Sequence, residues 1–246
     1  PEDVLKEISV YNNYEDKDQE VYTTRKDLRH INFITIDGAD AKDFDDAVFC
    51  HSSENGWKLF VAIADVEHFV SSGTAVDNEA LQRGTSVYFY DRVLPMLPEV
   101  LSNNLCSLRP NQPRLAIVCE MDIDFDGSTK NSKFYKAVIE SKARLTYSQV
   151  SSLISDGDFS PVSSSTSELI DNLSNLYKAQ TTYRKKRGAI NLDLPQLRII
   201  LDDNNEMLGV KNITRSIAHG IIEECMIAAN VEAAKFIKKS GIPTLY

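Results

Sequence analysis

Five aspartates lie in the short stretch from Asp37 to Asp46, and only Lys42 among them offsets their charge. If these carboxylates converge in space, their mutual repulsion requires a positive partner. Carboxylate oxygens are hard ligands, and a cluster without His or Cys favours Mg²⁺ or Mn²⁺ over zinc or copper. Two such cations suit hydrolysis at phosphorus, because one activates water and the other stabilises the leaving oxygen. The stretch therefore predicts a catalytic metal site, while a solvated acidic turn or one structural cation would fit the same charges.

The chain around this cluster must bend to bring the carboxylates together. The apolar run 31–36 predicts a buried strand, and a glycine allows the chain to turn directly after Asp37. In an extended chain, Asp43 and Asp45 would face one side and Asp46 the other, so a shared site needs a bend or bulge. We therefore expect the aspartates on a loop at the end of a strand.

A second acidic stretch, directly before Gly127, resembles the start of a calcium-binding loop. Lys133 stands at the position where such a loop needs a bidentate glutamate. Strand-like runs at 115–121 and 134–139 flank the stretch, so Gly127 predicts the turn of a hairpin instead.

Apolar periodicity predicts further elements along the chain. Additional strands are expected at 47–50, 57–64, 197–201 and 207–210. Helices are expected at 76–82, 165–188 and 216–240, and the second of these starts at a capping box that begins with Ser165. Residues 85–98 mix aromatic residues with prolines and are expected to be irregular.

The length and composition of the chain limit the classes of protein to which it can belong. The chain has 246 residues, 42% of them hydrophobic, which is enough for one large domain or a large domain with an appendage. It contains neither a run long enough to span a membrane nor a signal-like leader, and four scattered cysteines indicate neither a zinc site nor a disulfide framework. A reducing, cytoplasmic setting fits this pattern. Since no initiator methionine is present, we expect a piece of a longer chain.

The net charge of −9 argues against a nucleic-acid partner only at first sight. Residues 1–20 carry seven acidic and two basic residues, a net of −5, and bound metal would offset the aspartate cluster. Basic residues gather elsewhere, at Arg109 and Arg114, at Lys142 and Arg144, and at 184–187. The acidic segment 1–26 is expected to be a linker or an N-terminal extension, and 27–246 a separate domain.

Several motifs occur in a familiar order: the aspartate stretch 37–47, then the runs 61–66, 84–89, 95–103, 105–108 and 218–230. Together they strongly resemble the catalytic domain of the ribonuclease II / ribonuclease R family, and the last run is closer to ribonuclease R. The resemblance covers about residues 27–246. It implies an RNB-type domain of mixed α/β (α+β) fold, with a curved, largely antiparallel sheet and flanking helices.

The resemblance also implies a reaction. Members of the family hydrolyse single-stranded RNA processively from the 3′ end, using divalent metal, and release nucleoside 5′-monophosphates. Asp37, Asp43, Asp45 and Asp46 match the four active-site aspartates of the family. We expect Asp37, Asp43 and Asp46 chiefly as ligands of Mg²⁺, for which Mn²⁺ could substitute. Asp45 would position a second ion or the attacking water, so that Asp43 and Asp45 belong to the catalytic centre.

Three further positions are expected to contact RNA. Tyr88 matches the aromatic residue that stacks on a base near the 3′ end, and Glu223 matches an acid near the terminal ribose. Leu192 falls where some relatives place a second aromatic clamp residue, and a leucine can pack on a base but cannot stack in the same way.

The resemblance leaves parts of the family pattern without a counterpart. The family's catalytic domain continues past the position of Tyr246 with a segment that carries a transition-state-stabilising arginine, and it is flanked by cold-shock-like and S1 domains that grip single strands. We therefore expect a domain truncated at its C-terminus and weakly active or inactive alone. A non-catalytic RNA-binding relative of the family and a small-molecule metallophosphatase are the alternatives.

Overall fold

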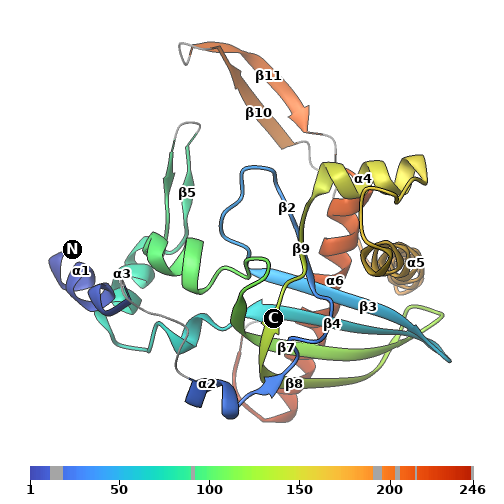
Figure 1. The fold of residues 1–246 in the computed structure, drawn as a ribbon, viewed down its shortest axis with the longest axis horizontal. Coiled ribbons are helices and arrows are strands. Elements are labelled where there is room, and N and C mark those ends of the chain that lie inside the picture. Colours follow the sequence, from blue (N-terminus) through green and yellow to red (C-terminus); the bar gives the residue numbers. More distant parts are fainter. Residues whose placement is uncertain (12–18, 90–91, 191–195, 203–205, 214, 245–246) are drawn as a thin grey trace.

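A seven-stranded sheet forms the centre of the chain, in the strand order β1-β8-β7-β4-β3-β2-β9 (Figure 1). The computed structural model describes residues 1–11, 19–89, 92–190, 196–202, 206–213 and 215–244. The strands are β1 (Lys26–Asp27), β2 (Ile34–Asp37), β3 (Asp46–Ser53), β4 (Gly56–Ala64), β7 (Pro113–Asp124), β8 (Thr129–Glu140) and β9 (Ala143–Thr146). Only the outer pairs β1–β8 and β2–β9 are parallel. The predicted mixed α/β fold with a largely antiparallel sheet is therefore confirmed.

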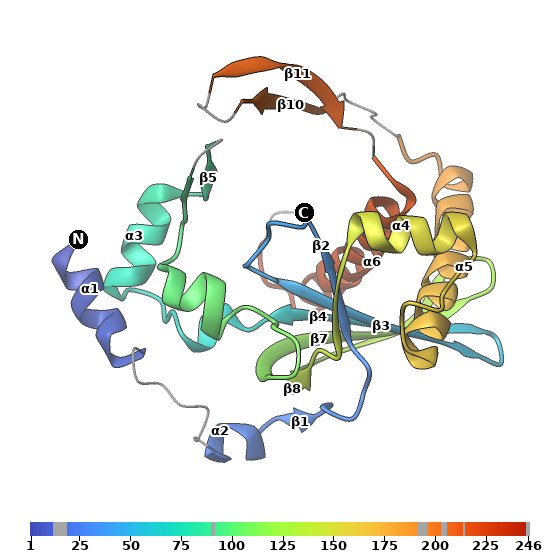
Figure 2. The same ribbon diagram turned by 45° about the horizontal axis from the view of Figure 1, so that its top comes forward.

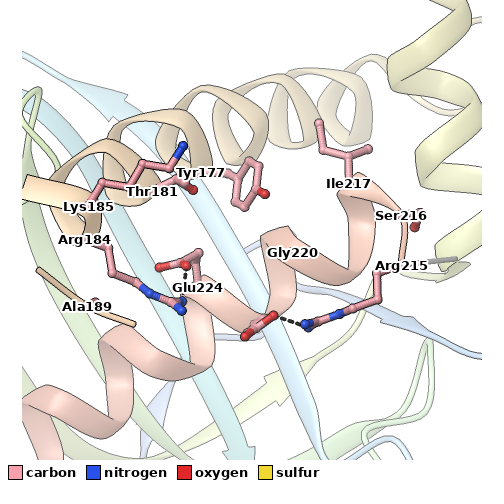
Figure 3. Close-up of a pocket in the computed structure, with 11 residues that line it drawn as sticks. Tyr177, Thr181, Arg184, Lys185, Ala189, Arg215, Ser216, Ile217, Gly220 and Glu224 are labelled. Atoms are coloured by element: carbon pink, nitrogen blue, oxygen red, sulfur yellow. Dashed lines mark hydrogen bonds and ion pairs between the residues drawn. The ribbon is translucent and has the colours of Figure 1, made fainter. Parts of the chain in front are cut away.

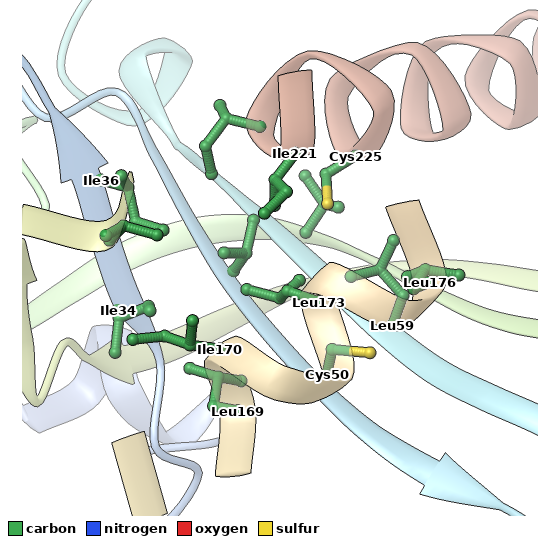
Figure 4. Close-up of a cluster of buried hydrophobic side chains, with 14 of the residues drawn as sticks. Ile34, Ile36, Cys50, Leu59, Leu169, Ile170, Leu173, Leu176, Ile221 and Cys225 are labelled. Carbon is green, nitrogen blue, oxygen red and sulfur yellow. The ribbon is translucent and has the colours of Figure 1, made fainter. Parts of the chain in front are cut away.

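Three helices cover one face of this sheet: α4 (Tyr147–Asp156), α5 (Ser164–Lys186) and α6 (Ile217–Lys239). Alternate side chains of β4, such as Leu59 and Val61, point to this face and pack with Leu173 and Ile221 (Figure 4). All of these side chains are almost fully buried. Burial of this apolar layer against the sheet fixes the position of β2, whose last residue is the first aspartate of the site.

The opposite face of the sheet packs on shorter elements. Phe60 and Ala62, which alternate with the residues above, join a second buried cluster that includes Leu101, Val76 and Val4. These elements are α1 (Glu2–Ile8), η1 (Ser9–Tyr11), α2 (Gln19–Thr23), η2 (Val66–His68), α3 (Ala75–Arg83) and η3 (Leu101–Leu105). The sheet is thus buried on both faces.

Two hairpins project from the body of the domain (Figure 1, Figure 2). They are β5–β6 (Val87–Tyr88 and Val93–Leu94) and β10–β11 (Gln196–Leu201 and Met207–Ile213). In the described part of the chain, no helix is both long and apolar enough to cross a bilayer.

Several expected elements differ from the structure. Val87–Tyr88 and Val93–Leu94 pair as the short strands β5 and β6, where irregular chain was expected. Helix α5 is capped by Ser163, whose hydroxyl accepts the Thr166 N–H, two residues before the expected capping box. The acidic N-terminal segment, expected as a linker or extension, contains α1, and the Glu7 carboxylate accepts the Ala75 N–H at the start of α3. The domain boundary at residue 27 stays a prediction.

The predicted hairpin turn at Gly127 is confirmed between β7 and β8, and it makes a close contact with α5. Gly127 has a φ of 85°, and a Cβ at this position would lie 2.5 Å from the carbonyl oxygen of Ala179. Gly127→Ala should therefore lower the free energy of unfolding by about 2–4 kcal/mol, measured by urea denaturation. Gly157 has a φ of 67° but no atom within 4 Å of its Cβ position. Gly157→Ala, the control, should cost about 1 kcal/mol, and equal losses would contradict the steric argument.

Candidate active site

The aspartate cluster occupies the connection between two paired strands. Asp37 is the last residue of β2, and Asp46 is the first residue of β3. The strands pair antiparallel, so the chain must reverse between them, and the loop 38–45 that makes the reversal carries Asp43 and Asp45. The structure thus has the predicted bend at the predicted strand end.

Hydrogen bonds from distant parts of the chain hold this loop in one conformation. The buried Ser107 hydroxyl donates to the carbonyl of Lys42 at 2.8 Å and accepts the N–H of Phe44 at 3.0 Å. The N–H of Leu108 donates to the Phe44 carbonyl at 2.8 Å, and the N–H of Ala64 donates to the Asp45 carbonyl at 2.9 Å. The second half of the loop is therefore fixed by its backbone, which leaves the carboxylates available.

The first half of the loop is held from β9. The Arg144 guanidinium donates to the carbonyls of Gly38 and Ala39 at 2.9 and 2.6 Å. Arg144 is in β9, which runs parallel to β2 in a register that pairs Asp37 with Thr146. The sequence identified Arg144 only as one basic residue among several, because nothing in the local pattern shows that it reaches the loop.

The loop borders an open cleft of about 790 Å³. Asp37, Asp43 and Asp45 line this cleft together with Tyr88, whose hydroxyl donates to a carboxylate oxygen of Asp43 at 3.3 Å. Tyr88 is 66% exposed, so its ring is accessible to a ligand in the cleft. The structure therefore brings three of the four predicted aspartates and the predicted aromatic residue to one surface.

The carboxylates of the cluster are close enough to perturb one another. Burial, followed by the charges of Asp37 and Asp45, raises the pKa of Asp46 to about 7. Burial and the charges of Asp43 and Asp45 raise the pKa of Asp37 to about 6, against the opposing effect of Arg144. Asp45 is exposed as a residue, yet partial burial of its carboxyl and the charge of Asp43 raise its pKa as well. The fourth aspartate, Asp46, thus belongs to the same electrostatic cluster.

The cluster offers carboxylate oxygens, which are the donor type that hard divalent cations prefer. One carboxylate oxygen of Asp37, Oδ2, is buried and has no hydrogen-bond partner in the described part of the chain. A buried, unpaired carboxylate oxygen beside other carboxylates is costly without a compensating positive charge. Among the described residues, no three His, Cys, Asp or Glu side chains meet the geometry of a preformed metal-binding group. The metal ligands therefore stay a prediction.

A different cavity, of about 480 Å³, lies between α5 and α6 (Figure 3), and its lining includes Glu223. The Glu223 carboxylate pairs with Arg215, while the adjacent Glu224 is buried and accepts a hydrogen bond from Arg184 at 2.5 Å. The two adjacent glutamates therefore have different ion-pair partners. Glu223 is not among the described residues that line the cleft beside the aspartates, and Leu192 lies outside the described residues.

One aromatic pair beside the cluster was not anticipated from the sequence. Tyr147, the first residue of α4, stacks on His219 of α6 with ring centroids 3.9 Å apart and an interplanar angle of 16°. Burial and the carboxylates of Asp37 and Asp46 raise the pKa of Tyr147 to about 12. This stack connects the aspartate cluster to the helix that carries Glu223, and only the three-dimensional packing brings the two rings together.

The fold and the site together define a mixed α/β domain whose clustered aspartates lie beside an open cleft, on and next to a loop that is held by hydrogen bonds from Ser107 and Arg144. The chain belongs to the RNB domain family, whose model matches residues 25–246. Ribonuclease R of Vibrio parahaemolyticus serotype O3:K6 is 45% identical over 253 residues, covering all of this chain and 30% of that protein. Ribonuclease R of Escherichia coli K12 is 44% identical over 234 residues, covering 94% of this chain and 29% of that protein.

A solved structure supports the same assignment. Mycoplasma genitalium RNase R in complex with ribose-methylated single-stranded RNA superposes with a TM-score of 0.90 at 32% identity, covering 95% of this chain and 37% of that one. The resemblance to the ribonuclease R branch of the family is thereby confirmed. The chain spans about 30% of the length of the curated relatives it matches.

Proposed function

We propose that this chain is the catalytic core of a longer, divalent-metal-dependent exoribonuclease that degrades single-stranded RNA from its 3′ end to nucleoside 5′-monophosphates. The observation that carries this proposal is the hydrogen-bonded loop 38–45, at which Asp37, Asp43 and Asp45 line a cleft that also exposes Tyr88, with Asp46 electrostatically coupled to them. Membership of the RNB family and the similarity to ribonuclease R support the choice of RNA as substrate.

In this proposal, Asp37, Asp43 and Asp46 hold Mg²⁺, or Mn²⁺ in its place, and Asp45 positions a second ion or the attacking water. Bound metal would supply the charge that activates water and stabilises the leaving oxygen. The protein contributes a loop backbone that is fixed by hydrogen bonds, so the carboxylates would be held near one another while their side chains turn toward the cations. The raised pKa values of Asp37 and Asp46 support this assignment, since a cation would stabilise carboxylates that are disfavoured first by burial and then by their mutual repulsion.

The RNA contacts are proposed from exposure and position. The accessible ring of Tyr88 can stack on a base, while its hydroxyl contacts Asp43, so a stacked nucleotide would lie beside the aspartates. Glu223 is proposed to contact the terminal ribose, which would require RNA to extend toward the cavity between α5 and α6. Leu192 is proposed to pack on a base without stacking.

The decisive experiment uses the full-length protein and 5′-end-labelled single-stranded RNA. With Mg²⁺ we expect the labelled strand to shorten progressively from its 3′ end, with release of nucleoside 5′-monophosphates and no product in EDTA. The 246-residue chain alone should be slower. Tight RNA binding without cleavage would support a non-catalytic relative instead, and turnover of simple phosphate esters without RNA cleavage would support a small-molecule phosphatase.

A further inference from the structure

Arg144 connects two parts of the site that are far apart in the sequence. One nitrogen of its guanidinium, Nη2, donates to the carbonyl oxygens of Gly38 and Ala39. The Gly38 carbonyl also accepts the N–H of Ala41 at 3.2 Å, so Arg144 closes the turn that directly follows Asp37. This turn sets the direction in which the chain leaves β2 toward the other aspartates.

Two further features fix the orientation of the Arg144 guanidinium. Its Cζ lies 5.6 Å from the ring centroid of Phe44, the residue between Asp43 and Asp45, and Phe44 is buried in the core. The strand pairing places Arg144 opposite Thr35, two residues before Asp37. The Arg144 side chain therefore lies against the loop to which it donates, between strand β9, which pairs with β2, and the buried ring of Phe44.

We propose that Arg144 is a positioning residue of the aspartate loop, and that it holds the Gly38–Ala39 turn so that the carboxylates on both sides of the loop can share bound cations. This inference deepens the proposed function and rests on it. Because Ser107, Leu108 and Ala64 already fix the second half of the loop, loss of Arg144 should release the first half alone.

The contact with Phe44 is what distinguishes arginine from a simple positive charge, because both hydrogen bonds to the loop come from the single nitrogen Nη2. A planar guanidinium can bind backbone carbonyls while it lies over an aromatic ring, whereas a lysine ammonium is a compact charge on a flexible stem. Arg144→Lys keeps the charge near Asp37 but loses this fixed geometry. The variant therefore separates a positioning role from simple charge neutralisation, and Arg144→Gln removes both.

The test compares the full-length wild type with Arg144→Lys and Arg144→Gln. Replacing a residue that orients metal ligands without contacting the metal typically lowers metal affinity or activity by about 10–100-fold. Both variants should therefore release mononucleotides about 30-fold more slowly and need about tenfold more Mg²⁺ for half-maximal rate. The dissociation constant for RNA and the melting temperature should stay close to those of the wild type. In the metal-free protein, backbone amides of 38–41 should exchange hydrogen faster, while those of β4 are unchanged. Lys142→Gln, which removes a nearby cation that pairs with Glu140, is the control and should match the wild type.

Two results would overturn the inference. The first is an Arg144→Lys variant with wild-type rate, Mg²⁺ requirement and amide exchange, which would show that charge alone suffices. The second is a loss of activity that is accompanied by an equal loss of RNA binding and by faster exchange throughout the sheet, which would show a general folding role. If the wild type itself cleaves no RNA, the proposed function fails. Faster amide exchange confined to residues 38–41 in the metal-free variants would still support the positioning role of Arg144.

Discussion

Replacing Asp45 by asparagine in the full-length protein should lower the rate of mononucleotide release about 10³-fold and leave the affinity for single-stranded RNA within about threefold. Asp45 lines the cleft, and its backbone carbonyl is anchored by the N–H of Ala64. Asparagine has nearly the same shape, so the anchored loop should persist while one negative charge disappears. Single-turnover cleavage of end-labelled RNA and fluorescence anisotropy would measure the two quantities separately.

A matched substitution outside the cleft separates the charge of Asp45 from the general effect of removing a carboxylate. Asp122, on β7, pairs with the Lys58 ammonium at 2.8 Å on the surface of the sheet. Asp122→Asn should cleave RNA at the wild-type rate. An undiminished rate in the Asp45 variant would refute its catalytic role, and a loss of RNA binding equal to the loss of rate would assign Asp45 to binding instead.

The local sequence pattern was sufficient to predict most strands of the sheet and the two longest helices. The runs that became β3, β4, β7 and β8 carry their own alternation and turn residues, so nearby residues determine them. Strand β9 was not predicted because it is only four residues long and gains its stability from parallel pairing with β2, more than a hundred residues earlier. Such long-range pairing leaves little periodicity in the sequence. Helix α4 was not predicted either, although Thr146 and Gln149 form a capping box at its start.

The same distinction separates the site residues that the sequence revealed from those it did not. The aspartates are visible because they are contiguous in the chain and their charge is unusual. The residues that hold the loop cannot be recognised from the sequence, because Arg144 lies 106 residues from Gly38 and Ser107 lies 65 residues from Lys42. A serine or an arginine is common in any chain, so only the fold shows that each one reaches the loop. The ligands can thus be proposed from sequence, whereas their positioning cannot.

Asp37 and Asp46 should make the metal-free chain less stable as the pH rises from about 4 to about 7. The pKa of Asp46 is raised to about 7 and that of Asp37 to about 6, whereas both titrate near about 3.9 in an unfolded chain. Between these values the folded state binds more protons than the unfolded state, so the free energy of unfolding falls with increasing pH. Above about pH 7 and below about pH 4 these two groups should contribute no further slope.

Asp46→Asn should remove much of this penalty, because asparagine resembles the protonated carboxyl and cannot ionise. The difference between a pKa of about 7 in the folded chain and about 3.9 in the unfolded chain corresponds to about 4 kcal/mol. Because part of this penalty is shared with Asp37, we expect the free energy of unfolding of the variant to exceed that of the wild type by about 2 kcal/mol at pH 8 in EDTA. Saturating Mg²⁺ should stabilise the wild type at pH 8 and the variant much less, because one proposed ligand is missing. Urea denaturation at pH 5 and pH 8, with EDTA or Mg²⁺, measures all of these differences.

Asp158→Asn is the control for Asp46→Asn, because the pKa of Asp158 is lowered rather than raised. Hydrogen bonds from Ser160 lower the pKa of Asp158, so loss of that charge should not stabilise the chain, and the slope between pH 4 and pH 7 should remain. If Asp46→Asn brings no gain at pH 8 and leaves the difference between pH 5 and pH 8 unchanged, burial and neighbouring charges do not disfavour the ionised Asp46 carboxylate in the folded chain. A cation would then have no unfavourable charge to offset there, and the loop from Asp37 to Asp46 would lose the physical basis for binding metal.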